Sequence, residues 1–92
     1  MKTLISKEAP NYSAEIVEHN GEKFKIVSEN GNSYWHVKIF VLTLNKDYQP
    51  IANEFEIPNT DKVSYISNPE ERIKGNRQNL EACKKFIKTV YK

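Results

Sequence analysis

The longest apolar run of the chain is the stretch YWHVKIFVLTL, residues 34–44. It mixes β-branched with aromatic residues, the composition that half-buried pleated strands favour. We therefore expect residues 34–44 to form the central strand of a small antiparallel sheet. The neighbouring strands follow from the turn signals on the N-terminal side of this run.

The first turn signal is Asn20-Gly21, between the alternating segments 14–19 and 22–29. A type I′ turn needs positive φ at both central residues, and Asn-Gly adopts these angles at low cost. A two-residue loop fixes the register of the hairpin. The expected pairs are Val17 with Phe24 and Glu18 with Lys23.

The second turn signal is Asn30-Gly31, and the same loop geometry there predicts a second hairpin. Its expected pairs are Ile26 with Trp35, Phe24 with Val37, and Glu22 with Ile39. The two registers agree, because together they place one apolar set on one face: Val17, Phe24, Ile26, Trp35, Val37, Ile39 and Val41. A slip of one residue would divide this set between both faces.

The opposite face is polar and basic at one end and apolar at the other. It is expected to hold Ile16, Glu18, Lys23, Lys25, Val27, Tyr34, His36, Lys38, Phe40, Leu42 and Leu44. An exposed apolar patch of this kind needs a cover, from another element or from a second subunit.

Three weaker patterns complete the predicted sheet. Leu4-Ile5 forms an edge strand, or residues 1–12 are a flexible terminus. Residues 51–57 form a strand whose Glu54 and Glu56 lie near Lys38 if Phe55 joins the Ile39 face. Residues 63–66 form a short fifth strand.

The C-terminal segment predicts a helix that starts at Asn68 as N-cap, with Pro69 at the first helical position. Gly75 leaves two alternatives, one helix over 69–91 or a short turn followed by a second helix. The apolar stripe has helical spacing and consists of Leu80, Cys83, Ile87 and Val90, widened by Phe86 and Tyr91. The fold class is therefore α+β: one domain, residues 1–92, with a meander of four to five strands and one C-terminal amphipathic helix packed on a sheet face.

Composition excludes several classes of protein. With 38% hydrophobic and 28% charged residues, the chain has enough apolar content for a folded domain. No apolar run is long enough to cross a membrane, and no apolar core follows the charged start MKTLISKE, so we expect neither a membrane helix nor a signal peptide. Cys83 is the only cysteine, which excludes an internal disulfide and a cysteine-based zinc site. We expect a cytoplasmic protein.

Residues suited to catalysis do not form a pattern. The only histidines, His19 and His36, fall on opposite faces of the predicted sheet and cannot share one metal ion within a monomer. Cys83 lies in the apolar stripe of the helix, where a buried structural thiol is expected. Glu54 and Glu56 are about 7 Å apart by strand geometry. Neighbouring exposed glutamates of this kind protect an edge strand against pairing with another sheet. We expect no enzyme, no cofactor and no metal site.

Protein binding is the function that the composition favours. Tyrosine and tryptophan are enriched in interface hot spots, and this chain has five tyrosines and one tryptophan. The candidate protein-binding residues are Tyr34, His36, Lys38 and Tyr48. We expect a small non-catalytic interaction module, an inhibitor or modulator of the type that phages and mobile elements encode. A homodimer through the sheet edge or the apolar patch is left open.

Nucleic-acid binding is the alternative. Residues 69–92 carry seven basic and three acidic side chains, and a basic sheet face with aromatic residues can stack single-stranded bases. The candidate residues are Lys23, Lys25, Lys38, Lys84, Lys85 and Lys88. A solvated face with cross-strand ion pairs explains the same pattern.

Overall fold

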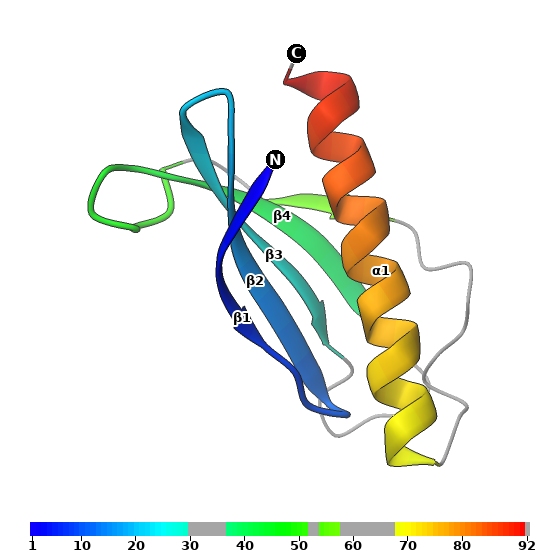
Figure 1. The fold of residues 1–92 in the computed structure, drawn as a ribbon. Coiled ribbons are helices and arrows are strands. Elements are labelled where there is room, and N and C mark those ends of the chain that lie inside the picture. The colour runs from blue at the N-terminus through cyan, green and yellow to red at the C-terminus, as the bar shows by residue number, and fades with distance from the viewer. Residues whose placement is uncertain (30–36, 52–53, 58–67, 92) are drawn as a thin grey trace.

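A computed structural model describes residues 1–29, 37–51, 54–57 and 68–91. In these ranges the chain forms five strands and one helix: β1 (Lys2–Lys7), β2 (Tyr12–His19), β3 (Glu22–Glu29), β4 (Lys38–Leu44), β5 (Phe55–Ile57) and α1 (Pro69–Val90). The strands build one antiparallel sheet in the order β1-β2-β3-β4-β5, and α1 packs across one face against β2, β3 and β4 (Figure 1). The predicted α+β meander with a C-terminal helix is confirmed.

The first hairpin has the predicted register. Val17 pairs with Phe24 and Glu18 pairs with Lys23. Asn20 has φ 53° and Gly21 has φ 81°, which are the two positive angles that a type I′ turn requires. The sequence was sufficient here because a two-residue loop leaves a single register.

The register predicted for the second hairpin is wrong. Ile26 pairs with Val41 and not with Trp35, Phe24 pairs with Thr43 and not with Val37, and the partner of Ile39 is Ser28 and not Glu22. Strand β3 ends at Glu29 and β4 starts at Lys38, so the connection is longer than two residues. The pairing is displaced by six positions, an even number, and the described side chains of β3 and β4 therefore keep their predicted faces. Trp35 itself lies outside the described residues.

The centre of the sheet is β3 and not the run 34–44. In the observed order β3 has β2 on one side and β4 on the other, whereas β4 has only the three-residue β5 beyond it. The strand in this run covers Lys38–Leu44. The apolar composition of the run correctly predicted a buried strand, but composition does not determine the order of strands.

The outer strands agree in part with the strands predicted from the sequence. The edge strand expected at Leu4-Ile5 is β1, which pairs with β2. The strand expected over 51–57 is shorter and covers Phe55–Ile57, and Ile51 precedes it with 63% of its surface exposed. Phe55 does join the Ile39 face, and Glu54 lies against Lys38 as predicted. The strand expected at 63–66 lies outside the described residues.

Helix α1 runs unbroken through Gly75, which decides between the two alternatives in favour of one helix. The Asn68 side chain accepts hydrogen bonds from the backbone N–H groups of Glu70 and Glu71, and Pro69 occupies the first turn, as predicted. Leu80, Cys83 and Ile87 are buried. Val90 was expected in the apolar stripe, and this expectation is wrong because Val90 is 52% exposed at the last turn of the helix. Tyr91 contacts the core there instead.

The main core lies between α1 and the sheet. Its buried members are Val17, Phe24, Ile26, Ile39, Val41, Leu80, Cys83 and Ile87, with Val37, Ile57, Phe86 and Tyr91 packed around them. The sheet residues of this core are the predicted apolar set, as far as that set is described. Burial of such side chains stabilises a fold by about 1.5–3 kcal/mol each, so this interface holds the helix on the sheet.

A buried polar network also lies in the interface between α1 and the sheet. The Ser28 hydroxyl donates to the Asn76 Oδ1 atom at 2.8 Å, and the Asn79 amide donates to the Ser28 Oγ atom at 3.1 Å. The Asn76 amide also donates to the backbone oxygens of Ala9 and Pro10, at 3.2 and 3.1 Å. The network therefore joins α1 both to the central strand and to the β1–β2 connection.

Candidate protein-binding surface

The sheet has a second face, which α1 does not cover and which we call the helix-free face. The pairing of the strands arranges its side chains in rows across the sheet. One central row consists of Lys7, Ala14, Val27, Phe40 and Glu56, and the other of Ile5, Ile16, Lys25 and Leu42. The rows beyond them hold Tyr12, Glu29 and Lys38 at one end and Lys2, Glu18, Lys23 and Leu44 at the other.

The centre of the helix-free face is apolar. Ala14, Val27 and Phe40 form a small second core, with Tyr12 and Leu42 partly buried against it. Toward the β1 edge the apolar surface becomes accessible, and Ile5 is 57% exposed. The apolar patch expected at Phe40, Leu42 and Leu44 is therefore corrected, because Phe40 and Leu44 are buried and the accessible apolar surface lies at β1 instead.

A groove of about 250 Å³ lies in this accessible part. Its lining residues are Ile5, Lys7, Tyr12, Ala14, Glu15, Ile16 and Lys25. Ile5, Tyr12, Ala14 and Ile16 provide apolar walls, contributed by β1 and β2. The carboxylate of Glu15 is paired with the Lys84 ammonium group at 3.2 Å. The charged groups left for a ligand in the groove are the two lysines.

Lysines surround the apolar centre and lie over its aromatic rings. The Lys7 ammonium nitrogen is 5.5 Å from the centre of the Tyr12 ring, and that of Lys38 is 4.9 Å from the centre of the Phe40 ring. Lys38 also forms an ion pair with Glu54 at 2.5 Å, and this hydrogen bond raises the pKa of the lysine. Lys7 and Lys25 form no ion pair with any described residue.

The edges of the sheet are protected against pairing with another strand. Strand β1 has Lys2 and Lys7 near its ends and a register shift between Thr3 and Ile5. Lysines and bulges on an edge both discourage the addition of a strand. Strand β5 is only three residues long. A partner is therefore better accommodated on the helix-free face than along an edge.

Tyr48 lies in a tight loop after β4. The Asn45 side chain accepts hydrogen bonds from the backbone N–H groups of Asp47 and Gln49, at 2.8 and 3.0 Å. Tyr48 has φ 62°, a left-handed backbone conformation that residues other than glycine rarely adopt. The residue is 46% exposed, and the Lys23 ammonium nitrogen lies 5.1 Å from the centre of its ring. The loop thus holds an aromatic ring at the surface at some conformational cost.

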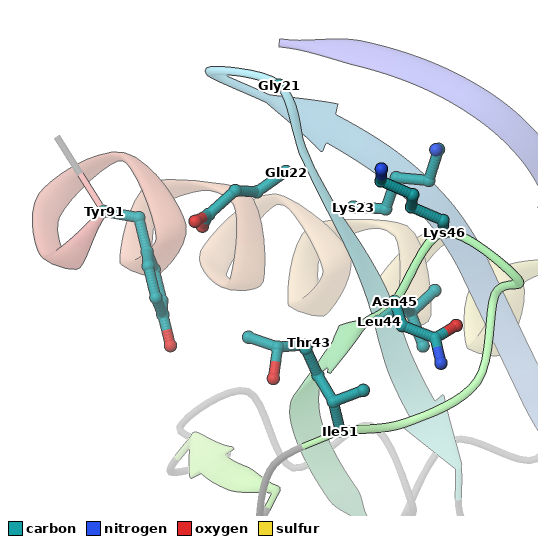
Figure 2. A pocket seen from close by; sticks show the side chains of 9 residues that line it. All are labelled: Gly21, Glu22, Lys23, Thr43, Leu44, Asn45, Lys46, Ile51 and Tyr91. Carbon is teal, nitrogen blue, oxygen red and sulfur yellow. The ribbon is translucent and has the colours of Figure 1, made fainter.

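A larger hollow, of about 470 Å³, lies at the end of the sheet near this loop. It is lined by Gly21, Glu22, Lys23, Thr43, Leu44, Asn45, Lys46, Ile51 and Tyr91. Figure 2 shows the Glu22 carboxylate pointing toward the space beside Tyr91, while the Lys23 and Lys46 side chains point away to the other side of β3. Its polar groups therefore do not converge on one point, and the hollow lacks the arrangement that typifies a ligand site.

The predicted protein-binding residues do not form one cluster. Lys38 begins β4 and Tyr48 follows its end, so the two lie about 20 Å apart by strand geometry. Tyr34 and His36 lie outside the described residues. Lys38 belongs to the helix-free face, and Tyr48 stands at its far end next to Lys23.

The predicted nucleic-acid-binding lysines are also divided. Lys23, Lys25 and Lys38 share the helix-free face, but Lys85 and Lys88 are exposed on α1, on the other side of the sheet. Lys84 is bound to Glu15 and Glu81. Burial opposes its charge, but these two carboxylates outweigh that effect and raise its pKa. The six lysines therefore form no continuous basic surface.

The remaining feature is the placement of side chains with catalytic or metal-binding potential. Cys83 is fully buried, and burial raises the pKa of its thiol to about 12, so the thiol is protonated at neutral pH. Within the described ranges, no three histidine, cysteine, aspartate or glutamate side chains gather where they could hold a metal ion. None of the described helices is long and apolar enough to cross a membrane.

The prediction from the sequence did not include the part of the surface that β1 provides. Lys7, Tyr12 and the wall formed by Ile5 were not predicted as site residues, because the strand 2–7 was left undefined. The segment KTLISK has Lys2, Ile5 and Lys7 on one face only because of the irregularity after Thr3. A regular alternation would have placed Lys2 and Ile5 on opposite faces, so the pattern could not indicate this arrangement.

Comparison with known proteins adds no further assignment: no protein-family model, curated protein or solved structure matches the chain.

Proposed function

We propose that the protein is a non-catalytic binding module that holds a protein partner on its helix-free face. The observation that carries this proposal is the accessible apolar groove beside β1, next to an apolar centre with lysines around it. Anchoring pockets for an apolar side chain, surrounded by polar groups, are typical of protein interfaces. The protected edges favour the face over strand addition.

The biological role we propose for this module is that of an inhibitor or modulator, of the type that phages and mobile elements encode. The support is compositional, since the chain is small and mixes acidic and basic residues. A cytoplasmic location belongs to the same proposal, because a chain with one cysteine needs no oxidising compartment for an internal disulfide.

Nucleic-acid binding is the second candidate, favoured by three lysines on one sheet face. Base stacking needs accessible ring faces. On the helix-free face, Phe40 is only 9% exposed and Lys7 lies over Tyr12. The exposed apolar side chain of the groove is the aliphatic Ile5, which suits a protein better than a nucleic acid.

The test uses two matched variants, Ile5→Glu on the helix-free face and Val90→Glu on α1. These residues are 57% and 52% exposed, so both substitutions should leave the fold intact. Tagged protein is used for affinity capture from nuclease-treated lysate, and bound proteins are compared. We expect a partner that wild type and Val90→Glu retain and Ile5→Glu loses. Equal capture by all three proteins would contradict a site on the helix-free face.

A further inference from the structure

The groove beside β1 has a charge that matches one class of partner. Its apolar walls are Ile5, Tyr12 and Ile16, and the lysines that line it, Lys7 and Lys25, form no ion pair within the described part of the chain. Lys25 pairs across the strands with Ile16 on one side and Leu42 on the other, so its aliphatic stem lies beside apolar side chains. The groove therefore combines a binding place for one apolar side chain with two cations.

The other lysines of the helix-free face each have a carboxylate beside them. Lys38 is paired with Glu54, while Lys2 and Lys23 stand opposite Glu18 on its two sides. Lys7 lies over Tyr12, a contact that leaves a cation able to accept a carboxylate partner. Lys7 and Lys25, by contrast, have only apolar cross-strand partners, Ala14 for Lys7 and Ile16 and Leu42 for Lys25, so no carboxylate stands opposite either of them.

We infer that the groove binds an acidic segment of a partner protein, with an apolar side chain packed on Ile5 and Ile16 and flanking carboxylates paired with Lys7 and Lys25. This inference rests on the proposed function and names the partner's chemistry. A second copy of the chain is a poor occupant, because two helix-free faces would bring four lysines together at the cost of like-charge repulsion. A single-stranded nucleic acid would have to displace Lys7 from the ring of Tyr12 before it could stack there.

The test is a selection of random 16-residue peptides displayed on phage, with wild-type protein as bait. We expect selected peptides to carry an apolar residue with aspartate or glutamate within about three positions. Binding should weaken at least tenfold for Lys7→Glu and Lys25→Glu, and by less than twofold for Lys85→Glu, a control lysine exposed on α1. Amide chemical shifts of Ile5, Ile16 and Lys25 should change when a selected peptide is added to labelled protein.

Three results would overturn the inference: selected peptides without acidic enrichment, equal binding by Lys25→Glu and wild type, or shift changes away from the groove. An oligonucleotide of twelve thymidines is titrated in parallel. If it causes the groove shifts while no acidic peptide does, the occupant is a nucleic acid. Loss of the lysate partner with Ile5→Glu but not with Lys7→Glu or Lys25→Glu would leave the proposed function standing and remove this inference alone.

Discussion

On the face that α1 covers, the sheet is apolar in the middle and Ser28 is hydrogen-bonded to the helix. On the helix-free face, the same strands leave an apolar surface with lysines around it. The difference arises residue by residue, since neighbours in a strand point to opposite faces. Ile26 is completely buried under α1, while Lys25 next to it borders the groove. One face therefore holds the main core, and the other holds the surface proposed for binding.

The covered face also shows how polar groups are tolerated in a core. Asn76 is fully buried, and its side chain has three hydrogen-bond partners in Ser28, Ala9 and Pro10. Buried polar groups that are satisfied in this way fix one arrangement of the packed elements. The ion pair of Lys38 with Glu54 on the helix-free face differs from this network, because its two side chains are 43% and 40% exposed.

The largest expected effect comes from truncating the same residue type on the two faces. Ile26→Ala should lower the free energy of unfolding by about 2–5 kcal/mol, because it leaves a cavity under α1. Ile16→Ala on the helix-free face should cost about 1 kcal/mol, since its side chain is only partly buried. Urea unfolding measures both values. Equal losses would mean that the two faces are packed alike.

The next effect concerns the polar network. Asn76→Ala should lower the free energy of unfolding by about 2–3 kcal/mol, because the Ser28 hydroxyl and two backbone oxygens lose a partner. Gln78→Ala, at an exposed position of the same helix, should change stability by less than about 0.5 kcal/mol. Thermal unfolding of the two variants compares them directly, and a neutral Asn76→Ala would show that the network is dispensable.

A smaller effect is expected in the loop after β4. Tyr48→Gly should raise the free energy of unfolding by up to about 1 kcal/mol, because glycine adopts a φ of 62° without the strain that a side chain causes. The matched control is Gln49→Gly, which should lower it by about 0.5–1 kcal/mol through chain entropy. If Tyr48→Gly destabilises as much as the control, the ring and not the backbone holds the loop.

The smallest effect is a dependence on pH. The hydrogen bond from Arg77 lowers the pKa of Glu8 below its ordinary value of 4.5. A carboxyl group whose pKa is lowered by folding stabilises the fold above the unfolded pKa, and this stabilisation is lost as the pH falls through the folded value. Glu8→Gln should therefore flatten the stability profile below about pH 4.5. Arg77→Gln should flatten it in the same way, and two different profiles would mean that the groups act separately.

The register of the second hairpin illustrates the limit of pattern reasoning on the fold. The apolar residues Phe24, Ile26, Ile39 and Val41 were placed on the correct face although their partners were wrong. Displacement by an even number of residues leaves the pattern of faces unchanged, so hydrophobic periodicity cannot detect it. The turn at Asn20-Gly21 was predicted fully because a two-residue loop admits one register.

The candidate site could be predicted only in part. Ile16 and Lys25 were placed on the correct face from alternation alone, and the apolar patch was expected to need a partner. The groove itself needs β1, whose irregularity after Thr3 moves Ile5 and Lys7 onto that face. Strand pairing between distant segments brings these residues together, and no local pattern encodes it.

The sequence alone determined the local features of this protein: the turn at Asn20-Gly21, the helix start at Asn68, and the alternation that gives each strand two faces. These follow from backbone angles, capping and periodicity, which act over a few residues. The tertiary structure decided the strand order, the pairing of β3 with β4, the passage of the helix through Gly75 and the groove beside β1. Each of these depends on contacts between distant residues, because packing selects among arrangements that local preferences leave equally acceptable.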